Sequence, residues 1–126
     1  MLSRTLAIIL LAFWLALAPA AQATELVMVE AKRCHYCIEW KAEIGPIYPK
    51  TEVGSYAPLR IVDIADGAPD GMDFARRVNF TPTFILVDEG QELARIEGYP
   101  GEDFFWGLLT MMLEDNTDFE DSAKTN

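Results

Sequence analysis

Arg33-Cys34-His35-Tyr36-Cys37-Ile38 contains the only two cysteines of the sequence, and two residues separate them. If a helix begins at Cys34, the two side chains share one face and their sulfurs can close a disulfide. Cys34 would then lie at the helix N-terminus, where free backbone amides and the positive end of the helix dipole favour a thiolate. The spacing therefore predicts a reversible dithiol, with Cys34 as the nucleophile and Cys37 as the residue that resolves a mixed disulfide.

Other uses of a cysteine pair fit this sequence less well. A structural zinc ion needs four ligands, and the single histidine, His35, lies inside the motif itself. Covalent haem attachment needs a histidine directly after the second cysteine, where this chain has Ile38. We therefore expect neither a metal nor a cofactor. A purely structural disulfide stays open as an alternative, although closing so short a loop constrains little of the unfolded chain.

The first 23 residues have the pattern of a secretory signal. Arg4 precedes an apolar run over residues 6–18, and Ala21-Gln22-Ala23 has the small residues of a cleavage site. A retained membrane anchor is the alternative, but the run is shorter than the roughly 20 residues that span a bilayer. We expect cleavage after Ala23 and a periplasmic mature protein that starts at Thr24.

Composition limits the classes of partner. The chain has 126 residues, with 20 acidic and 10 basic side chains and a net charge of −10. A surface of this sign repels phosphate groups, which argues against nucleic acid and anionic lipid as ligands. The length predicts one domain, over residues 24–114. We also expect a monomer. Residues 115–126 are acidic and short of aliphatic side chains, so we expect a disordered tail there.

Hydrophobic periodicity and turn residues indicate an α/β fold. The patterns predict strands over 25–31, 59–64, 83–87 and 92–97, helices over 35–44 and 102–113, a helix capped by Asp70 that extends through Arg76 or Arg77, and a loop from Gly45 to Pro58. Asp88-Glu89-Gly90 joins the last two strands as a hairpin. The cysteine pair follows the carboxyl end of the first strand, where α/β sheets place their functional sites.

These features together resemble the thioredoxin fold over nearly all of residues 25–113. The features are the cysteine pair at the start of a helix, Thr81-Pro82 before the hairpin, and Gly98 after the fourth strand. The resemblance implies a mixed four-stranded sheet with flanking helices. It also implies that Pro82 is cis and lies beside the cysteines, and that Thr81 offers backbone groups to a substrate peptide. Taken alone, Thr81-Pro82 would instead indicate an ordinary turn with a trans peptide bond.

The residues around the cysteines depart from thioredoxin in two ways. Thioredoxin has a buried acid six residues before its first cysteine, where this chain has Met28; Glu30 is either a substitute proton acceptor or a solvated strand end. Its Gly-Pro dipeptide is replaced by His35-Tyr36. Because the cations that flank Cys34 favour a charged sulfur, we expect the pKa of its thiol to lie below the ordinary value. The expected redox-tuning residues are Glu30, Lys32, Arg33, His35 and Tyr36.

Three stretches resemble more particularly the small periplasmic thioredoxins of bacterial sulfur-oxidation (Sox) systems: residues 28–30, 45–49 and 98–106. This resemblance implies a thiol:disulfide oxidoreductase that reduces the carrier cysteine of a sulfur-binding client protein. It also implies a membrane thiol reductant as the electron donor. Two alternatives stay open, a disulfide oxidase or isomerase and a non-catalytic binding module. The module would use an apolar patch of Tyr99, Phe104, Phe105 and Trp106, although aromatic residues of a terminal amphipathic helix usually pack on the sheet.

Overall fold

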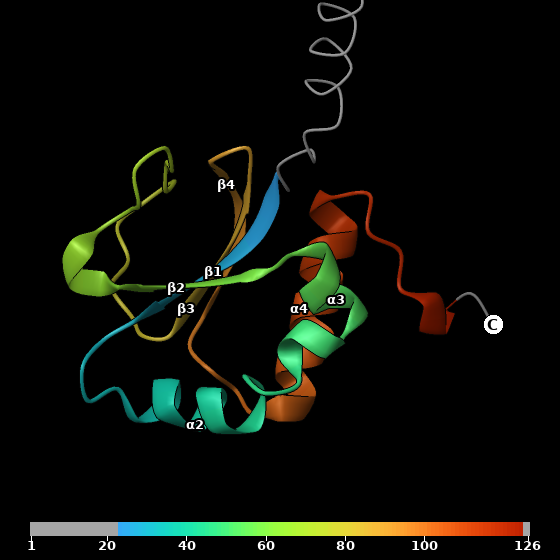
Figure 1. Ribbon diagram of the computed structural model, residues 1–126, viewed down its shortest axis with the longest axis horizontal. Helices are drawn as coiled ribbons and strands as arrows, with labels where there is room; N and C mark the ends of the chain where they lie inside the picture. The colour runs from blue at the N-terminus through green and yellow to red at the C-terminus, as the bar shows by residue number, and fades with distance from the viewer. Residues whose placement is uncertain (1–22, 125–126) are drawn as a thin grey trace, which may run out of the picture.

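A mixed sheet of four strands forms the centre of the computed structural model, which describes residues 23–124 (Figure 1). The strands are β1 (Thr24–Glu30), β2 (Leu59–Asp63), β3 (Thr83–Asp88) and β4 (Gln91–Glu97). Their order in the sheet is β2-β1-β3-β4, with β2 parallel to β1 and with β3 antiparallel to both of its neighbours. The predicted four-stranded mixed sheet is confirmed.

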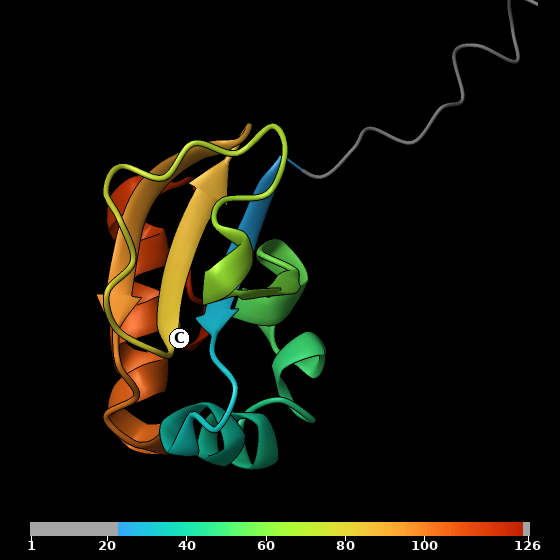
Figure 2. The same cartoon turned by 90° about the vertical axis from the view of Figure 1, so that its left-hand side faces the viewer.

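This topology brings three connecting segments to one edge of the sheet. Because β3 runs opposite to the other strands, its first residue lies beside their last residues. Thr83 pairs with Val29 on β1 and with Glu97 on β4, and Glu30 pairs with Asp63 on β2. The turn that follows β1, the loop that enters β3 and the loop that leaves β4 therefore meet at the same edge, which Figures 1 and 2 show above α2 (His35–Glu43).

Helices cover one face of the sheet. They are α2, α3 (Glu52–Tyr56) and α4 (Glu102–Asn116). The core below them centres on Trp40, whose ring centroid lies 5.1 Å from that of Phe84 and 5.7 Å from that of Phe105. All three side chains are fully buried, and rings of this size contribute most of the apolar area of a small core. This packing holds α2, and with it the cysteine pair, against β3 and α4.

A loop covers the other face. Residues 67–82 pass across it, as Figure 2 shows, and Val78 packs there against Val27, Val29 and Ile85. The predicted helix after Asp70 is wrong. An isolated helix of about eight residues is marginal, and this segment bonds to β4 instead. The Asp73 N–H donates to the Gly90 carbonyl oxygen at 2.7 Å, and the Glu92 N–H donates to that of Asp73 at 3.2 Å.

The predicted loop from Gly45 to Pro58 contains two helical segments instead. A 3₁₀ turn over Tyr48–Lys50 leads into α3, and the Thr51 side chain caps α3 by accepting a hydrogen bond from the Gly54 N–H at 3.0 Å. The Tyr48 hydroxyl donates to the Ala57 carbonyl oxygen at 2.6 Å and joins the two ends of this region. The prolines and glycines of this segment indicated a loop, and the five residues of α3 are too few to display a helical period.

The C-terminal segment differs from the predicted disordered tail as far as it is described. Helix α4 continues to Asn116, and Phe119 is 7% exposed with its ring 5.3 Å from that of Tyr56. Beyond it, the Ser122 hydroxyl donates to the Glu52 carboxylate at 2.6 Å. The predicted signal segment lies outside the described residues except for Ala23. No helix within residues 23–124 is long and apolar enough to cross a membrane.

Candidate active site

The two cysteines lie at the start of α2, as the sequence predicts. Cys34 is the N-cap residue, and a disulfide joins it to Cys37 with a Cα–Cα distance of 5.2 Å. Cys37 is 1% exposed, whereas Cys34 is only partly buried. A nucleophile or a client disulfide can therefore reach the sulfur of Cys34 but not that of Cys37.

Backbone geometry at this helix end favours negative charge on the Cys34 sulfur. The Cys37 N–H donates to Cys34 Sγ at 3.2 Å. A hydrogen bond to the charged form of a group, together with the positive end of the helix dipole, stabilises that form. After reduction of the disulfide, the same helix end would face a thiolate on the residue that solvent reaches.

Positive side chains precede Cys34 in an exposed turn. Lys32 and Arg33 are exposed, and among the described residues neither forms an ion pair with a carboxylate. His35 is also exposed, and its Nε2 lies 3.7 Å from Glu39 Oε2. Tyr36 is 55% exposed beside it, with the two ring centroids 5.4 Å apart. The predicted tuning residues of this stretch are thus all exposed and flank Cys34 in the chain.

Glu30 has a partner that the sequence analysis missed. Its Oε2 lies 2.5 Å from Lys41 Nζ, and the Glu30 side chain is 26% exposed. Lys41 follows Cys37 by four residues, so the two share a helix face, but no spacing in the sequence links Lys41 to Glu30. Met28, at the position of thioredoxin's acid, is fully buried in the apolar core. Glu30 is thus an ion-paired residue at the end of β1, not a free strand end.

The Thr81-Pro82 peptide bond is cis, as the resemblance implied and contrary to the alternative of a trans turn. Pro82 is buried, and its carbonyl oxygen accepts a hydrogen bond from the Gly98 N–H at 2.7 Å. The Thr83 hydroxyl donates to the Phe80 carbonyl oxygen at 2.7 Å. These contacts hold Pro82 at the edge of the sheet from which the chain enters α2.

The four aromatic residues of the alternative binding patch do not form one surface. Tyr99 is 7% exposed, Phe105 is fully buried, and Trp106 stacks on Tyr48 with ring centroids 6.2 Å apart. Only Phe104 among them is largely exposed, at 72%. The Tyr99 hydroxyl donates to Glu43 Oε2 at 2.5 Å, and burial together with this carboxylate raises the pKa of Tyr99. The aromatic residues therefore chiefly attach α4 and α2 to the sheet.

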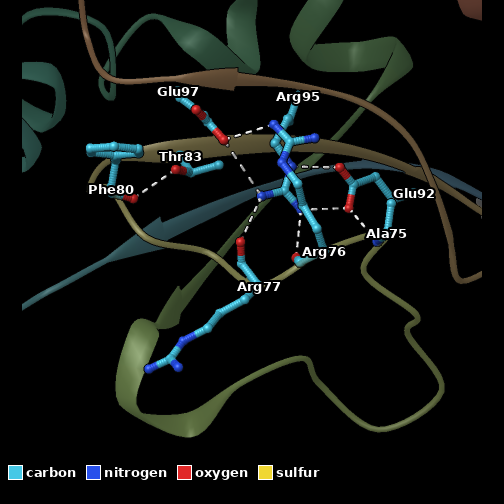
Figure 3. Close-up of polar contacts among 8 residues, drawn as sticks. All are labelled: Ala75, Arg76, Arg77, Phe80, Thr83, Glu92, Arg95 and Glu97. Carbon is cyan, nitrogen blue, oxygen red and sulfur yellow. Dashed lines mark hydrogen bonds and ion pairs between the residues drawn. The ribbon is translucent and has the colours of Figure 1, made fainter.

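An ion pair on β4 is the second feature that the sequence analysis missed. Arg95 donates to the Glu92 carboxylate through Nε at 2.6 Å and through Nη2 at 2.7 Å (Figure 3). Residues three apart in a regular strand point to opposite faces, but the register shift opposite Leu86 and Val87 brings these two side chains to the same face. No periodic pattern of the sequence reveals such a bulge.

A cleft of about 710 Å³ lies on the loop-covered face, away from the cysteines. Val29, Ile64, Phe74, Arg77 and Val78 are among the residues that line it, and neither cysteine is. Within residues 23–124, no group of three or more His, Cys, Asp or Glu side chains is placed to hold a metal ion.

Comparison with known proteins decides the family. A model described as a thioredoxin-like domain matches residues 15–112. The crystal structure of the reduced periplasmic thioredoxin SoxS from Paracoccus pantotrophus is 46% identical, with a TM-score of 0.71 over 72% of this chain and 96% of that one. This chain belongs to the thioredoxin-like family. With the Cys34–Cys37 disulfide in place, this thioredoxin-like protein is a thiol:disulfide oxidoreductase.

More distant structures share the fold of this thioredoxin-like protein. A thioredoxin from Malassezia sympodialis is 20% identical, with a TM-score of 0.51 over 72% of this chain and 76% of that one. A thioredoxin-fold protein from Helicobacter pylori is 17% identical, with a TM-score of 0.53 over 81% of this chain and 76% of that one. A comparison with proteins of curated function finds no match.

Proposed function

We propose that this thioredoxin-like protein is a periplasmic reductant that acts on a client protein with a reactive cysteine, such as a sulfur-carrier cysteine. One observation carries the proposal: a partly exposed Cys34 at a helix N-terminus, in a chain 46% identical to a periplasmic thioredoxin. Export would follow from the signal segment, with cleavage after Ala23.

The reaction proceeds by two thiol–disulfide exchanges. In the reduced protein, the Cys34 thiolate attacks a sulfur of the client disulfide or sulfur adduct; that S–S bond breaks and its other sulfur leaves as a thiolate. The Cys37 thiol then loses its proton and attacks Cys34 Sγ, which releases the client thiolate and leaves the Cys34–Cys37 disulfide. A membrane thiol reductant returns two electrons and two protons to restore the dithiol.

The surrounding residues serve this exchange in two ways. Thr81 holds the client segment through its backbone groups at the edge of the sheet, and the cis Pro82 places Thr81 there. Lys32, Arg33, His35 and Tyr36 tune the charge on Cys34, and Glu30, with Lys41, accepts or passes the proton of Cys37. The first group supports binding and the second supports the exchange, so their variants should change different kinetic constants.

The test replaces each cysteine in the exported full-length chain. Cys37→Ser should accumulate mixed disulfides with client proteins, and Cys34→Ser should accumulate none, because only Cys34 is accessible. Wild-type protein should also accelerate the reduction of insulin by dithiothreitol, and Cys34→Ser should abolish the acceleration. Equal trapping by both variants would overturn the assigned roles. Absence of acceleration by the wild type would favour a binding module.

The direction of electron flow needs a separate measurement. Equilibration with glutathione gives the reduction potential of the Cys34–Cys37 pair. We expect a value between those of thioredoxin, roughly −270 mV, and of the strong oxidant DsbA, roughly −120 mV. A value at or above that of DsbA would favour the oxidase alternative over the reductant.

A further inference from the structure

The loop that leads to Pro82 is fixed to β4 by a nearly buried ion pair. We call Glu92 and Arg95 the loop clamp; each side chain is 4% exposed, although both belong to an edge strand. Their two nitrogen–oxygen contacts, 2.6 and 2.7 Å long, form the forked geometry that arginine makes with a carboxylate. Residues 75–77 of the loop lie beside this pair and contact it through their backbone (Figure 3).

The two side chains of the clamp also form hydrogen bonds with the loop backbone. Glu92 Oε2 accepts from the Ala75 N–H at 2.7 Å. Arg95 Nη2 donates to the Arg76 carbonyl oxygen at 2.9 Å, and its Nη1 lies 3.5 Å from that of Arg77. One carboxylate and one guanidinium thus satisfy backbone groups on three successive residues. An apolar pair of the same volume would leave these backbone groups without those partners.

A second ion pair extends this attachment toward the active-site edge. Arg76 Nη2 donates to Glu97 Oε1 at 2.8 Å, and Glu97 pairs with Thr83 across the sheet. Only residues 78–81 separate the clamped segment from Pro82, which the Gly98 N–H holds in turn. The short span is therefore fixed at both ends, so its path depends on where the clamp holds residues 75–77.

We propose that the loop clamp positions the segment 78–82 for client binding. Glu92 and Arg95 are positioning residues in this assignment, since they act through the loop backbone and lie away from the reacting sulfurs. The inference rests on the proposed function in one respect, which is that clients bind along Thr81 and Pro82. Loss of the clamp weakens binding of a protein client while the exchange at Cys34 proceeds.

Two substrates separate binding from exchange. Insulin is a protein disulfide that needs the loop, and hydroxyethyl disulfide is a small neutral one that needs only Cys34. For Arg95→Met we expect the KM for insulin to rise about tenfold with little change in kcat, as for loss of uniform binding. The ratio of insulin to hydroxyethyl disulfide reduction should fall by a similar factor. Arg95→Lys keeps the charge but loses the fork, so it should give an intermediate ratio.

Arg60→Met is the matched control. Arg60 is also an arginine on an edge strand paired with a glutamate, at 3.7 Å from Glu25, but it lies on β2 and half exposed. For Arg60→Met, the ratio of insulin reduction to hydroxyethyl disulfide reduction should equal that of the wild type. An unchanged ratio in Arg95→Met, or an equal fall in Arg60→Met, would overturn the proposal. If Arg95→Met does not fold, Arg76→Met serves instead, because it removes only the exposed ion pair with Glu97. Arg76→Met should lower the ratio of insulin to hydroxyethyl disulfide reduction by less than the roughly tenfold fall expected for Arg95→Met. An unchanged ratio in Arg76→Met would then contradict the proposal.

Amide hydrogen exchange tests the positioning step without any client. Exchange of the Asp73 and Ala75 amides, which donate hydrogen bonds to Gly90 and to Glu92, should be faster in Arg95→Met than in the wild type, while the amides of α2 keep their wild-type rates. Equal exchange of these two amides would overturn the clamp itself. Failure of wild-type protein to reduce insulin would instead overturn the proposed function, and the exchange measurement would still decide whether the clamp fixes the loop.

Discussion

Arg33 has a left-handed backbone conformation, with φ of 62°, one residue before the accessible cysteine. The turn is closed by the Cys34 N–H, which donates to the Ala31 carbonyl oxygen at 3.3 Å. An L-residue in this conformation costs roughly 1–2 kcal/mol because its Cβ approaches the following carbonyl oxygen. This strain lies in the turn that joins β1 to α2, and a glycine at position 33 would avoid it.

Replacing Arg33 measures that cost. Arg33→Gly and Arg33→Ala both remove the charge, but only glycine adopts positive φ freely. We expect the free energy of unfolding of the oxidised protein to be about 1 kcal/mol higher for Arg33→Gly than for Arg33→Ala. Urea denaturation of the two variants, with Lys32→Ala as a charge control, gives the difference. Equal stabilities would show that the turn relaxes when the arginine is removed.

Residue roles could be predicted where they depend on local spacing. Cys34 and Cys37 are three positions apart, so their shared face and unequal exposure follow from a helix whose N-cap is Cys34. The partner of Glu30 could not be predicted, because it depends on how α2 lies against the end of β1. Arg95 was missed for a similar reason, since a bulge in β4 decides which face it occupies.

Helix α3 is short, and a glycine allows it to approach the preceding turn. A Cβ added to Gly54 would lie 1.8 Å from the Tyr48 carbonyl oxygen and 3.1 Å from Thr51 Oγ1. Both neighbours are fixed, since that carbonyl oxygen also accepts the Thr51 hydroxyl at 2.7 Å. Gly107 in α4 is the opposite case, because nothing lies within 4 Å of its added Cβ.

The same substitution should therefore have opposite effects in the two helices. Gly54→Ala should lower the free energy of unfolding by about 3 kcal/mol, the upper part of the range for overpacking against fixed neighbours. Gly107→Ala should raise it by about 0.5–1 kcal/mol, since alanine is the better helix former at an open interior position. Thermal or urea denaturation of both variants tests this. Destabilisation by Gly107→Ala would mean that its open face is occupied by another molecule.

All four predicted strands and the helices α2 and α4 are present, and the long apolar runs of β1 and β3 made these two strands the easiest to assign. β1 and β3 are buried on both faces, so their sequences are almost continuously apolar, and α4 buries Phe105, Leu109, Met112 and Leu113 at helical spacing. The segment after Asp70 was assigned wrongly because its backbone partners lie on β4, which is distant in sequence. Local helix propensity carries no information about hydrogen bonds to a distant strand. It therefore cannot predict that this segment bonds to the edge of β4 instead of forming a short helix.

At the scale of the whole molecule, the stability of the fold in acid should depend on the carboxylate of Glu92. Burial alone would raise the pKa of Glu92, but hydrogen bonds from Arg95 and the Ala75 N–H and the nearby positive charges lower it. A lowered pKa in the folded state contributes stability at neutral pH, and that stability is lost as pH falls through the carboxylate range. The loop over residues 67–82 should therefore loosen first in acid.

Glu92→Gln tests this dependence. Between pH 7 and about pH 3, the wild type should lose more stability than Glu92→Gln, since the variant has no proton to gain at this position. At neutral pH the variant should already be less stable, by about 3 kcal/mol, as for loss of one partner of a buried pair. Glu120→Gln, at an exposed position, should keep the wild-type pH profile. Parallel profiles for Glu92→Gln and the wild type would contradict the shift.

The central place of β1 in the sheet affects the order in which the chain can fold. β1 is the first element described, yet its two neighbours come later, and Thr24 pairs with Asp88. Contacts so distant in sequence make folding slow, because a long loop must close before the pairing is gained. A chain that ends before β3 would leave the apolar stretch of β1 with one open edge, a template for aggregation. Folding of this domain must therefore wait until most of the polypeptide is available in one compartment.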